Sequence, residues 1–285
     1  MTSPPEERPR TIARLSLSPR VLAQVYRAFL RISFAIQLQY RASMIIWLLG
    51  IILRPVIYLV VWSTVARSSG GNVAGFTPED FAAYYIIFMV VDHLTFTWIM
   101  WEYDYRIRMG EFSVMLLRPI HPVHGDIADN IAYKLLTLVI LLPVIALLIW
   151  LFNPVFQMEW WAAAAFVPAL GLAFLGRFLL GWALAMLAFW TTRIAALNES
   201  FFVLELFFAG RLAPLAIMPV FLQSAANLLP FKWLVAFPVE LLQGLLTPRE
   251  ALFGLGMQLL WLGIILVMMR LIWQAGIRRY AAFGG

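Results

Sequence analysis

The sequence contains no cysteine, so neither a disulfide bond nor a thiolate metal site can contribute to this fold. Only 13% of its 285 residues are charged, whereas 63% are hydrophobic, which is more apolar surface than the core of a soluble protein buries. The apolar residues form runs of about twenty, the length that a helix needs to cross the hydrocarbon of a bilayer. The sequence therefore predicts an all-α membrane protein with several spans.

Lysine is nearly absent as well, since Lys134 and Lys232 are the only two. A loop that binds the phosphates of a nucleotide needs a glycine-rich turn followed by lysine and a hydroxyl residue, and neither lysine lies in such a pattern. We therefore expect no nucleotide site on this chain and no enzymatic activity of its own. The formal net charge of +6 comes mainly from arginines that flank apolar runs, which is not the single basic face typical of nucleic-acid binding.

Six apolar segments are long enough to span a membrane. When both termini are placed inside, fifteen lysines and arginines fall in the inside segments and three in the outside segments. Because these residues accumulate in short cytoplasmic loops, we expect a multi-pass protein of the inner cell membrane with both termini in the cytoplasm. The predicted spans cover residues 44–66, 81–101, 131–152, 160–190, 197–213 and 251–273.

The N-terminal region has a different pattern from the rest of the chain. Between residues 19 and 41, apolar side chains recur at helical spacing and most arginines fall elsewhere. This pattern is typical of a helix that lies on the membrane surface. We therefore divide the chain into a cytoplasmic tail with an interfacial helix, residues 1–43, and a single transmembrane domain, residues 44–285.

The segment between the second and third spans, residues 102–129, is too polar to enter the bilayer and predicts a sizeable cytoplasmic loop. A glycine and a proline bracket a short helix within it. Phe112, Leu116 and Leu117 give this helix an apolar face. Because a lone two-turn helix has few neighbours, we expect this face to be exposed to the cytoplasm and to dock on a partner protein.

The same segment contains His121, His124 and Asp126 in the sequence His-Pro-Val-His-Gly-Asp. These residues could be metal ligands or the acid–base pair of an acyltransferase. A metal site needs more ligands than this loop supplies, and the remaining histidine, His93, falls in a predicted span. We therefore favour polar residues near the membrane surface, and we predict no metal site and no catalytic residue.

A long apolar stretch, residues 214–248, precedes the last span. Pro219, Pro230 and Pro238 interrupt it, and a proline inside a helix removes a backbone hydrogen bond and breaks the helix. The pieces are about fifteen residues long, which is too short to cross the bilayer. We expect two re-entrant helices on the extracytoplasmic side, whose broken backbone lines a gate or a vestibule.

Several charged side chains fall within predicted spans, where charges are costly and often functional. Arg54 and Asp92 lie near the middle of the first two spans and could pair, whereas Arg177 and Glu205 lie near one level of the fourth and fifth spans. Arg211 lies further out, beside the re-entrant helices. These residues either form buried pairs that fix helix packing or line a translocation path, in which unmatched positive charge would favour an anionic substrate.

These features together resemble the permease subunits of type-2 ABC exporters, a family that moves drugs, polysaccharides and lipids outward. The resemblance covers nearly the whole chain, from the surface helix through the spans to the re-entrant helices, and it implies an ATPase-coupling helix and an outer gate. The coupling residues that it implies are Gly110, Glu111, Phe112, Leu116, Leu117, Arg118 and Pro119. The outer-gate signature comprises Gly210, Pro214, Pro219, Leu229, Pro230, Phe231, Pro238 and Gly244.

The resemblance also implies partners. It points to a bacterial branch in which two different permeases share one ATPase, so we expect a hetero-dimer, with a homo-dimer as the alternative, in contact with membrane lipids. ATP and Mg would bind to the separate ATPase, and this chain would need no cofactor. Arg211 departs from the small or apolar residues of the outer-gate signature, which argues against a purely hydrophobic route.

Two other functions stay open. A polytopic lipid-modifying enzyme would need a cluster of acid, base or nucleophile near a membrane surface, and only the histidine segment approaches one. A secondary transporter would need repeated halves or paired interrupted helices, whereas the predicted breaks lie only in the second half of the chain. We therefore predict the membrane-spanning permease of an ATP-driven exporter, which forms half of the translocation pathway.

Overall fold

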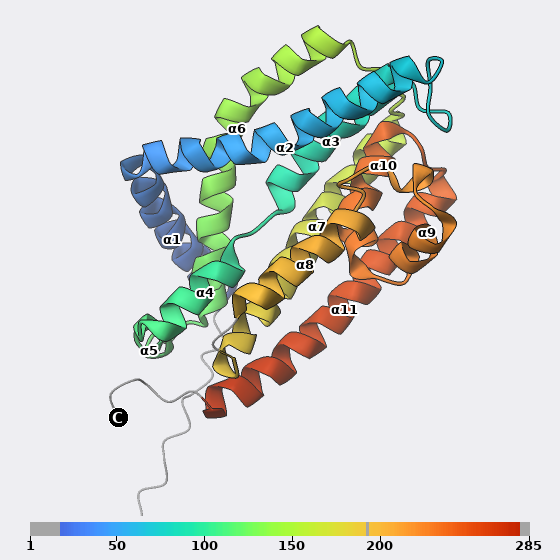
Figure 1. Ribbon diagram of the computed structural model, residues 1–285. Coiled ribbons are helices and arrows are strands. Elements are labelled where there is room, and N and C mark those ends of the chain that lie inside the picture. The colour runs from blue at the N-terminus through green and yellow to red at the C-terminus, as the bar shows by residue number, and fades with distance from the viewer. Residues whose placement is uncertain (1–17, 192–193, 280–285) are drawn as a thin grey trace, which may run out of the picture.

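A computed structural model describes residues 18–191 and 194–279, and the regular structure of these residues is helical apart from one bridge between Val73 and Phe76 (Figure 1). The prediction of an all-α fold is confirmed. The α-helices are α1 (Pro19–Gln39), α2 (Arg41–Ser68), α3 (Pro78–Thr95), α4 (Ile99–Arg108), α5 (Glu111–Leu116), α6 (Pro122–Phe152), α7 (Trp160–Ala185), α8 (Ile194–Phe208), α9 (Val220–Asn227), α10 (Phe237–Gln243) and α11 (Pro248–Arg279). Two 3-10 turns, Met186–Phe189 and Leu215–Ile217, and one π-helix, Lys232–Ala236, complete the elements.

Six helical segments among the described residues are long and apolar enough to cross a membrane: α1, α2, α3 together with α4, α6, α7 with the turn that follows it, and α11. The least apolar of them is α1, whose best stretch has a mean hydropathy of 1.2 against 3.0 for α6. The helix pair before α11 is bent by 86° between α9 and Lys232–Gln243, as the prolines of this stretch predict.

The fifth predicted span, residues 197–213, is shorter in the structure. Helix α8 has 15 residues and ends at Phe208, which is less than the ~20 residues needed to cross the hydrocarbon. The chain turns there because Gly210 adopts a φ of +74°, a conformation that glycine reaches without strain. A side chain at this position would also collide with the Tyr84 hydroxyl, which lies 2.4 Å from where the Cβ would be.

The centre of the bundle is α3. Its side chains are buried almost throughout, Phe81, Tyr84 and Phe88 among them, because α2, α7 and α10 pack around it (Figure 1). By contrast, only 17% of the most apolar stretch of α6 and of α11 is buried, as expected of helices that face lipid. A capping box between Thr77 and Asp80 starts α3 by satisfying its first backbone donors.

One apolar segment is divided into α3 and α4 by an extended break at residues 96–98. Phe96 has a φ of −65° and a ψ of 148°, outside the helical region. The Lys134 ammonium on α6 donates to the Phe96 carbonyl, and the Arg177 guanidinium donates to Thr95 Oγ1 at 2.7 Å. Polar side chains of neighbouring helices therefore satisfy groups that the break would leave unpaired in an apolar interior.

The polar segment 102–129 is largely helical and includes the short helix that the sequence predicts. Helix α4 continues to Arg108 and α6 begins at Pro122, with α5 between them. Gly110 joins α4 to α5 in the left-handed conformation, with a φ of 74°. Helices α4 and α5 lie together at one end of the molecule (Figure 1). We call this end of the molecule the α5 end and the opposite end, which carries α9 and α10, the α9 end.

Candidate functional site

Charged side chains from α3, α7, α8 and the segment after α8 meet inside the bundle, and we call Asp92, Arg177, Glu205 and Arg211 the ion network. Arg177 lies 3.0 Å from Asp92 Oδ1 and 2.6 Å from Glu205 Oε1. Arg211 lies 2.9 Å from Asp92 Oδ1 and 3.0 Å from Glu205 Oε2. Each arginine therefore bridges both carboxylates.

The ion network is nearly closed to solvent and electrically balanced, since it contains two guanidinium groups and two carboxylates. The exposed fractions are 5% for the side chain of Arg177 and 12% for that of Arg211. The pair that the sequence analysis placed at one level, Arg177 and Glu205, is present. Arg211 belongs to the same network, so the expectation that it lies further out with an unmatched charge was wrong. Removing one member would leave a buried charge without its partner.

Arg54 does not pair with Asp92, which corrects another expectation. Both carboxylate oxygens of Asp92 already accept hydrogen bonds from Arg177 and Arg211. Arg54 is exposed on α2, and its side chain has no ion pair or hydrogen bond with any residue that the structure describes. Arg54 is therefore a positive charge without an acidic partner among the described residues.

The backbone that carries Arg211 is fixed by aromatic side chains of α2 and α3. The Tyr84 hydroxyl donates to the Gly210 carbonyl at 2.6 Å. The Tyr85 hydroxyl and the Trp62 indole N–H both donate to the Leu212 carbonyl, each at 2.8 Å. These bonds satisfy the backbone where α8 has ended, and they hold the Arg211 side chain against the carboxylates.

A second, largely buried cluster lies at the α5 end, where rings from α4, α5, α7, α11 and two connecting segments meet. We call this set the aromatic cluster: Tyr103, Phe112, His121, Trp182, Phe189 and Trp273.

Phe112 is the part of the aromatic cluster that α5 contributes, and its side chain is fully buried. Its ring centroid lies 5.6 Å from that of Tyr103, 5.5 Å from that of Phe189 and 6.0 Å from that of Trp273. The expectation that Phe112 is exposed was wrong, because α5 folds back on the ends of its own spans. Phe112 therefore anchors α5 to the bundle.

Asp126 connects the aromatic cluster to α6. The Tyr103 hydroxyl donates to Asp126 Oδ2 at 2.5 Å, and the Arg106 guanidinium donates to Asp126 Oδ1 at 2.7 Å. The Trp182 indole N–H donates to the Tyr103 hydroxyl at 3.0 Å. One carboxylate thus links α4, α6 and, through the tyrosine, α7.

The histidine segment has no catalytic arrangement in this structure. His121 lies against Trp273, with ring centroids 4.4 Å apart, and burial together with the neighbouring His124 lowers the pKa of His121 to about 4. His124 Nδ1 is hydrogen-bonded to the Tyr26 hydroxyl at 3.0 Å, whereas Asp126 faces Tyr103 and Arg106. The three side chains have separate partners, and no group that could hold a metal ion occurs within the described residues.

Three exposed apolar side chains surround the anchored Phe112, and we call Met109, Val114 and Leu117 the α5 patch. Their exposed fractions are 63%, 58% and 85%. Leu116, by contrast, packs partly against the core. The apolar face that the sequence analysis assigned to this helix is therefore divided between an inner anchor and an outer patch, with Glu111 and Arg118 exposed beside it.

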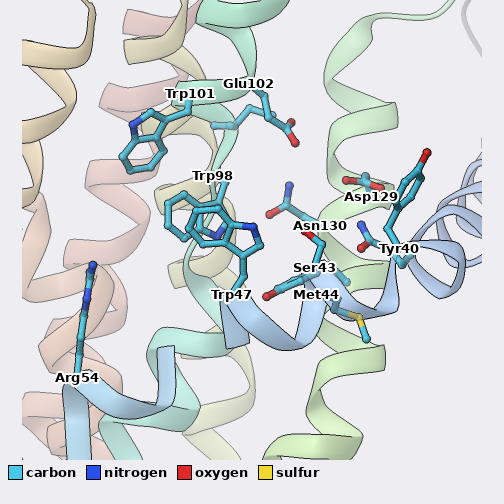
Figure 2. A pocket seen from close by; sticks show the side chains of 13 residues that line it. Tyr40, Ser43, Met44, Trp47, Arg54, Trp98, Trp101, Glu102, Asp129 and Asn130 are labelled. Atoms are coloured by element: carbon cyan, nitrogen blue, oxygen red, sulfur yellow. The ribbon is translucent and has the colours of Figure 1, made fainter. Parts of the chain in front are cut away.

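A groove lies beside α2 and consists of two adjoining cavities of about 640 Å³ and about 380 Å³. Trp47, Arg54 and Trp98 line both cavities. In Figure 2, Trp47 and Trp98 lie between Arg54 and the polar end of the larger cavity, where Asp129 lies. The smaller cavity reaches the ion network, because Asp92 and Arg211 are among its lining residues.

A comparison with known families shows to which family this chain belongs. The family described as ABC-2 family transporter protein matches residues 26–284, which is nearly the whole chain. The chain belongs to this family. It is thus a multi-pass membrane protein and the permease component of an ABC transporter. No curated protein and no solved structure gives a significant match.

The residues that the sequence analysis assigned to an outer gate lie together at the α9 end of this ABC-2 permease. Pro214 and Pro219 immediately precede the 3-10 turn and α9, and Pro238 lies in the first turn of α10. Pro230 precedes Phe231, whose buried ring lies 5.4 Å from Phe201 on α8. Pro214, Pro219 and Pro230 thus lie where an element starts and a missing N–H is tolerated. Pro238 instead lies inside the continuous helical run of residues 230–243, directly after the π-helix.

The sequence analysis of this permease did not identify the groove or the aromatic cluster. Their residues lie far apart in the chain and were assigned to ordinary apolar spans, as Trp182 and Trp273 show. The one available signal was Arg54, a charge near the middle of an apolar run.

Proposed function

We propose that this permease forms half of the pathway of an ATP-driven exporter and that a separate ATPase docks at its α5 end. In this proposal the α5 end and both termini face the cytoplasm, the protein lies in the inner membrane of a bacterium, and a second permease completes the pathway. A different permease is favoured over a second copy. ATP and Mg are held by the ATPase.

The observation that carries the docking proposal is the division of α5 into two faces. Leu117 and Val114 are exposed at an end of the molecule that carries several charged residues. Contiguous exposed apolar residues commonly mark interaction sites. Glu111 and Arg118 are exposed beside this patch and can orient a partner through charges at the rim. A groove on the ATPase would cover the α5 patch.

The inner face of α5 supports a role in energy coupling. Phe112 contacts rings of α4, of the turn after α7 and of α11, so a force applied to α5 reaches three spans. Close-packed interiors transmit displacement because they are hardly compressible. A docked ATPase that moves α5 would therefore move α4, which also borders the groove.

The groove supports the proposal that a second permease completes the pathway. It is bordered by α1, α2, α4, α6 and α8. The adjoining face of α2 carries exposed apolar side chains, with Ile46, Leu53 and Ile57 among them. A second permease that covers this face would enclose a pathway between two grooves. The proposal therefore requires a dimer of permeases and two docked ATPase subunits.

The docking proposal is tested with Leu117→Asp in the complex purified with its ATPase. We expect the isolated variant to keep its thermal stability, because the side chain is solvated, and to lose the ATPase during purification, since truncating an interface anchor costs about 2 kcal/mol or more. The matched control is Leu228→Asp at the α9 end, where the leucine is 78% exposed. If Leu117→Asp retains a fully active ATPase, or if Leu228→Asp loses it equally, the docking surface is elsewhere.

A further inference from the structure

We propose that the groove binds an anionic amphiphile, with its anionic group at Arg54 and its apolar part against Trp47, Trp98 and Phe202. The inference rests on the proposed export function in one respect, because the bound compound would then be the cargo. Binding itself is argued from the charges, the rings and the size of the groove.

The first step is the position of Arg54. This residue lies about 20 Å from either end of α2 at the 1.5 Å rise of a helix, and it is followed by Pro55 within the helix. An unpaired charge near the middle of a membrane-spanning helix is costly and requires a counter-charge or water. No described residue supplies that counter-charge.

The second step is the surrounding charge. The nearby carboxylates, Asp92 and Glu205, are bridged by Arg177 and Arg211 in a network that is already balanced. Arg54 therefore adds one positive charge to the groove. A guanidinium group binds phosphate or carboxylate through two parallel hydrogen bonds, so an anionic group is the ligand chemistry that this position fits.

The third step concerns the opposite end of the larger cavity, which is acidic. Glu102 and Asp129 line it, and Glu102 is paired with Arg106 at 3.2 Å. Figure 2 shows Trp47 and Trp98 between this end and Arg54. An anionic group is therefore repelled from the acidic end and attracted to the Arg54 end, which fixes its position along the groove.

The fourth step is the wall that holds the apolar part. The ring centroids of Trp47 and Trp98 lie 5.1 Å apart, those of Trp98 and Trp101 lie 4.8 Å apart, and those of Trp101 and Phe202 also lie 4.8 Å apart. The rings form one continuous apolar surface beside Arg54. The smaller cavity is lined mainly by apolar and aromatic side chains, and its charged residues are Arg54, Asp92 and Arg211. Such a lining is typical of small-molecule sites.

Because the chain has no cysteine, one introduced thiol can report on this site alone. Gly50 lies one helical turn before Arg54, lines the same cavity, and has open space where a Cβ would be. We expect dodecyl phosphate to slow the reaction of Gly50→Cys with N-ethylmaleimide in the purified, full-length permease. Gly263→Cys on α11, which also has open space, is the matched control and should react at an unchanged rate.

Specificity for the anionic group is tested with ligands and variants together. Uncharged dodecyl glycerol should protect Gly50→Cys far less than dodecyl phosphate does. Arg54→Gln should weaken protection by dodecyl phosphate about tenfold, because it removes hydrogen bonds to a charged group, while Arg67→Gln near the end of the same helix should not. Arg54→Lys, which keeps the charge, should retain part of the protection.

Two results would overturn the proposal. One is equal protection by the charged and uncharged ligands. The other is wild-type protection by dodecyl phosphate in the Arg54→Gln variant. If this variant also dissociates the permease dimer, the counter-charge of Arg54 is supplied by the second permease and not by a ligand.

The source of the ligand is identified in nanodiscs. If phosphatidylglycerol protects Gly50→Cys without added dodecyl phosphate, the natural ligand is a membrane lipid. If only added dodecyl phosphate protects it, the natural ligand is a free amphiphile. No ATPase is present in these assays. Loss of ATPase docking with intact protection would therefore contradict only the proposed coupling, and loss of protection with intact docking would contradict only the ligand site.

Discussion

The ion network and the aromatic cluster both join several helices, but they do so with different chemistry. The ion network consists of four full charges that are nearly buried. The aromatic cluster consists of rings and is joined through Tyr103 to one buried carboxylate, Asp126, whose partner Arg106 has a side chain that is 23% exposed. Charges in an apolar interior require every partner, whereas rings contribute mainly through contact area.

This difference indicates what each cluster fixes. The ion network holds the segment that carries Arg211, because this guanidinium donates to both Asp92 and Glu205. The aromatic cluster instead joins several helix ends at once through ring contacts. We therefore expect the two clusters to respond differently when single residues are removed.

The largest effect is expected in the ion network. Arg177→Met alone should destabilise the permease by about 3–5 kcal/mol, because it leaves a buried carboxylate charge uncompensated. The double variant Arg177→Met/Glu205→Leu should recover much of this loss, since Arg211 and Asp92 remain paired. Denaturation of the purified variants measures both values.

Equal losses in the single and the double variant would show that the network does not depend on charge balance. A stable double variant that also transports normally would exclude both residues from the translocation path. A stable double variant without transport would place them in that path.

A smaller loss is expected for Phe112→Ala, at about 3 kcal/mol, because it opens a cavity among packed rings. The matched variant Leu117→Ala should change the stability by less than about 0.5 kcal/mol, since its side chain is exposed. Thermal unfolding of the isolated permease distinguishes the two. If both variants are equally stable, Phe112 does not anchor α5.

Asp126→Asn should cost about 1–3 kcal/mol, because it weakens the charged hydrogen bonds from Tyr103 and Arg106 but keeps the shape of the side chain. Tyr103→Phe should cost less, since Arg106 still satisfies the carboxylate. The measurement is the unfolding midpoint in denaturant. A loss as large as that of Arg177→Met would mean that the aromatic cluster depends on charge as strongly as the ion network does.

The smallest effect is expected at the surface of α4. Arg108 and Asp104 form an i,i+4 pair at 2.7 Å, and the arginine side chain is 60% exposed. Arg108→Ala should cost about 0.3–0.5 kcal/mol, and the difference should vanish at high salt. A larger loss would show that the end of α4 has a role beyond local helix stability.

Much of the fold was predictable because lipid imposes long apolar runs and because prolines interrupt helices locally. Five of the six predicted spans, the N-terminal helix and the bent pair before α11 follow from these two effects. The end of α8 did not, since the turn at Gly210 is stabilised by hydroxyl and indole groups of α2 and α3 that are distant in sequence.

The sites were less predictable because they depend on which faces meet. Helix position alone placed Arg177 and Glu205 at one level, and their pairing followed. Helix position did not show that Asp92 would pair with Arg211 and not with Arg54, because the turn after α8, which brings Arg211 back to the network, was not predicted. The burial of Phe112 was missed because the exposure of a short helix depends on the helices beside it.

The extended break at residues 96–98 has a mechanical consequence. It separates α3, which is enclosed at the centre of the bundle, from α4, which is joined through Tyr103 to the rings that hold α5. The polypeptide can change direction there without breaking a continuous helix, and Trp98 places the same joint on the wall of the groove. In the proposed coupling, α4 would act as a lever arm about this joint: an ATPase that displaces α5 would rotate α4, and with it the wall of the groove at Trp98, while α3 stays in place.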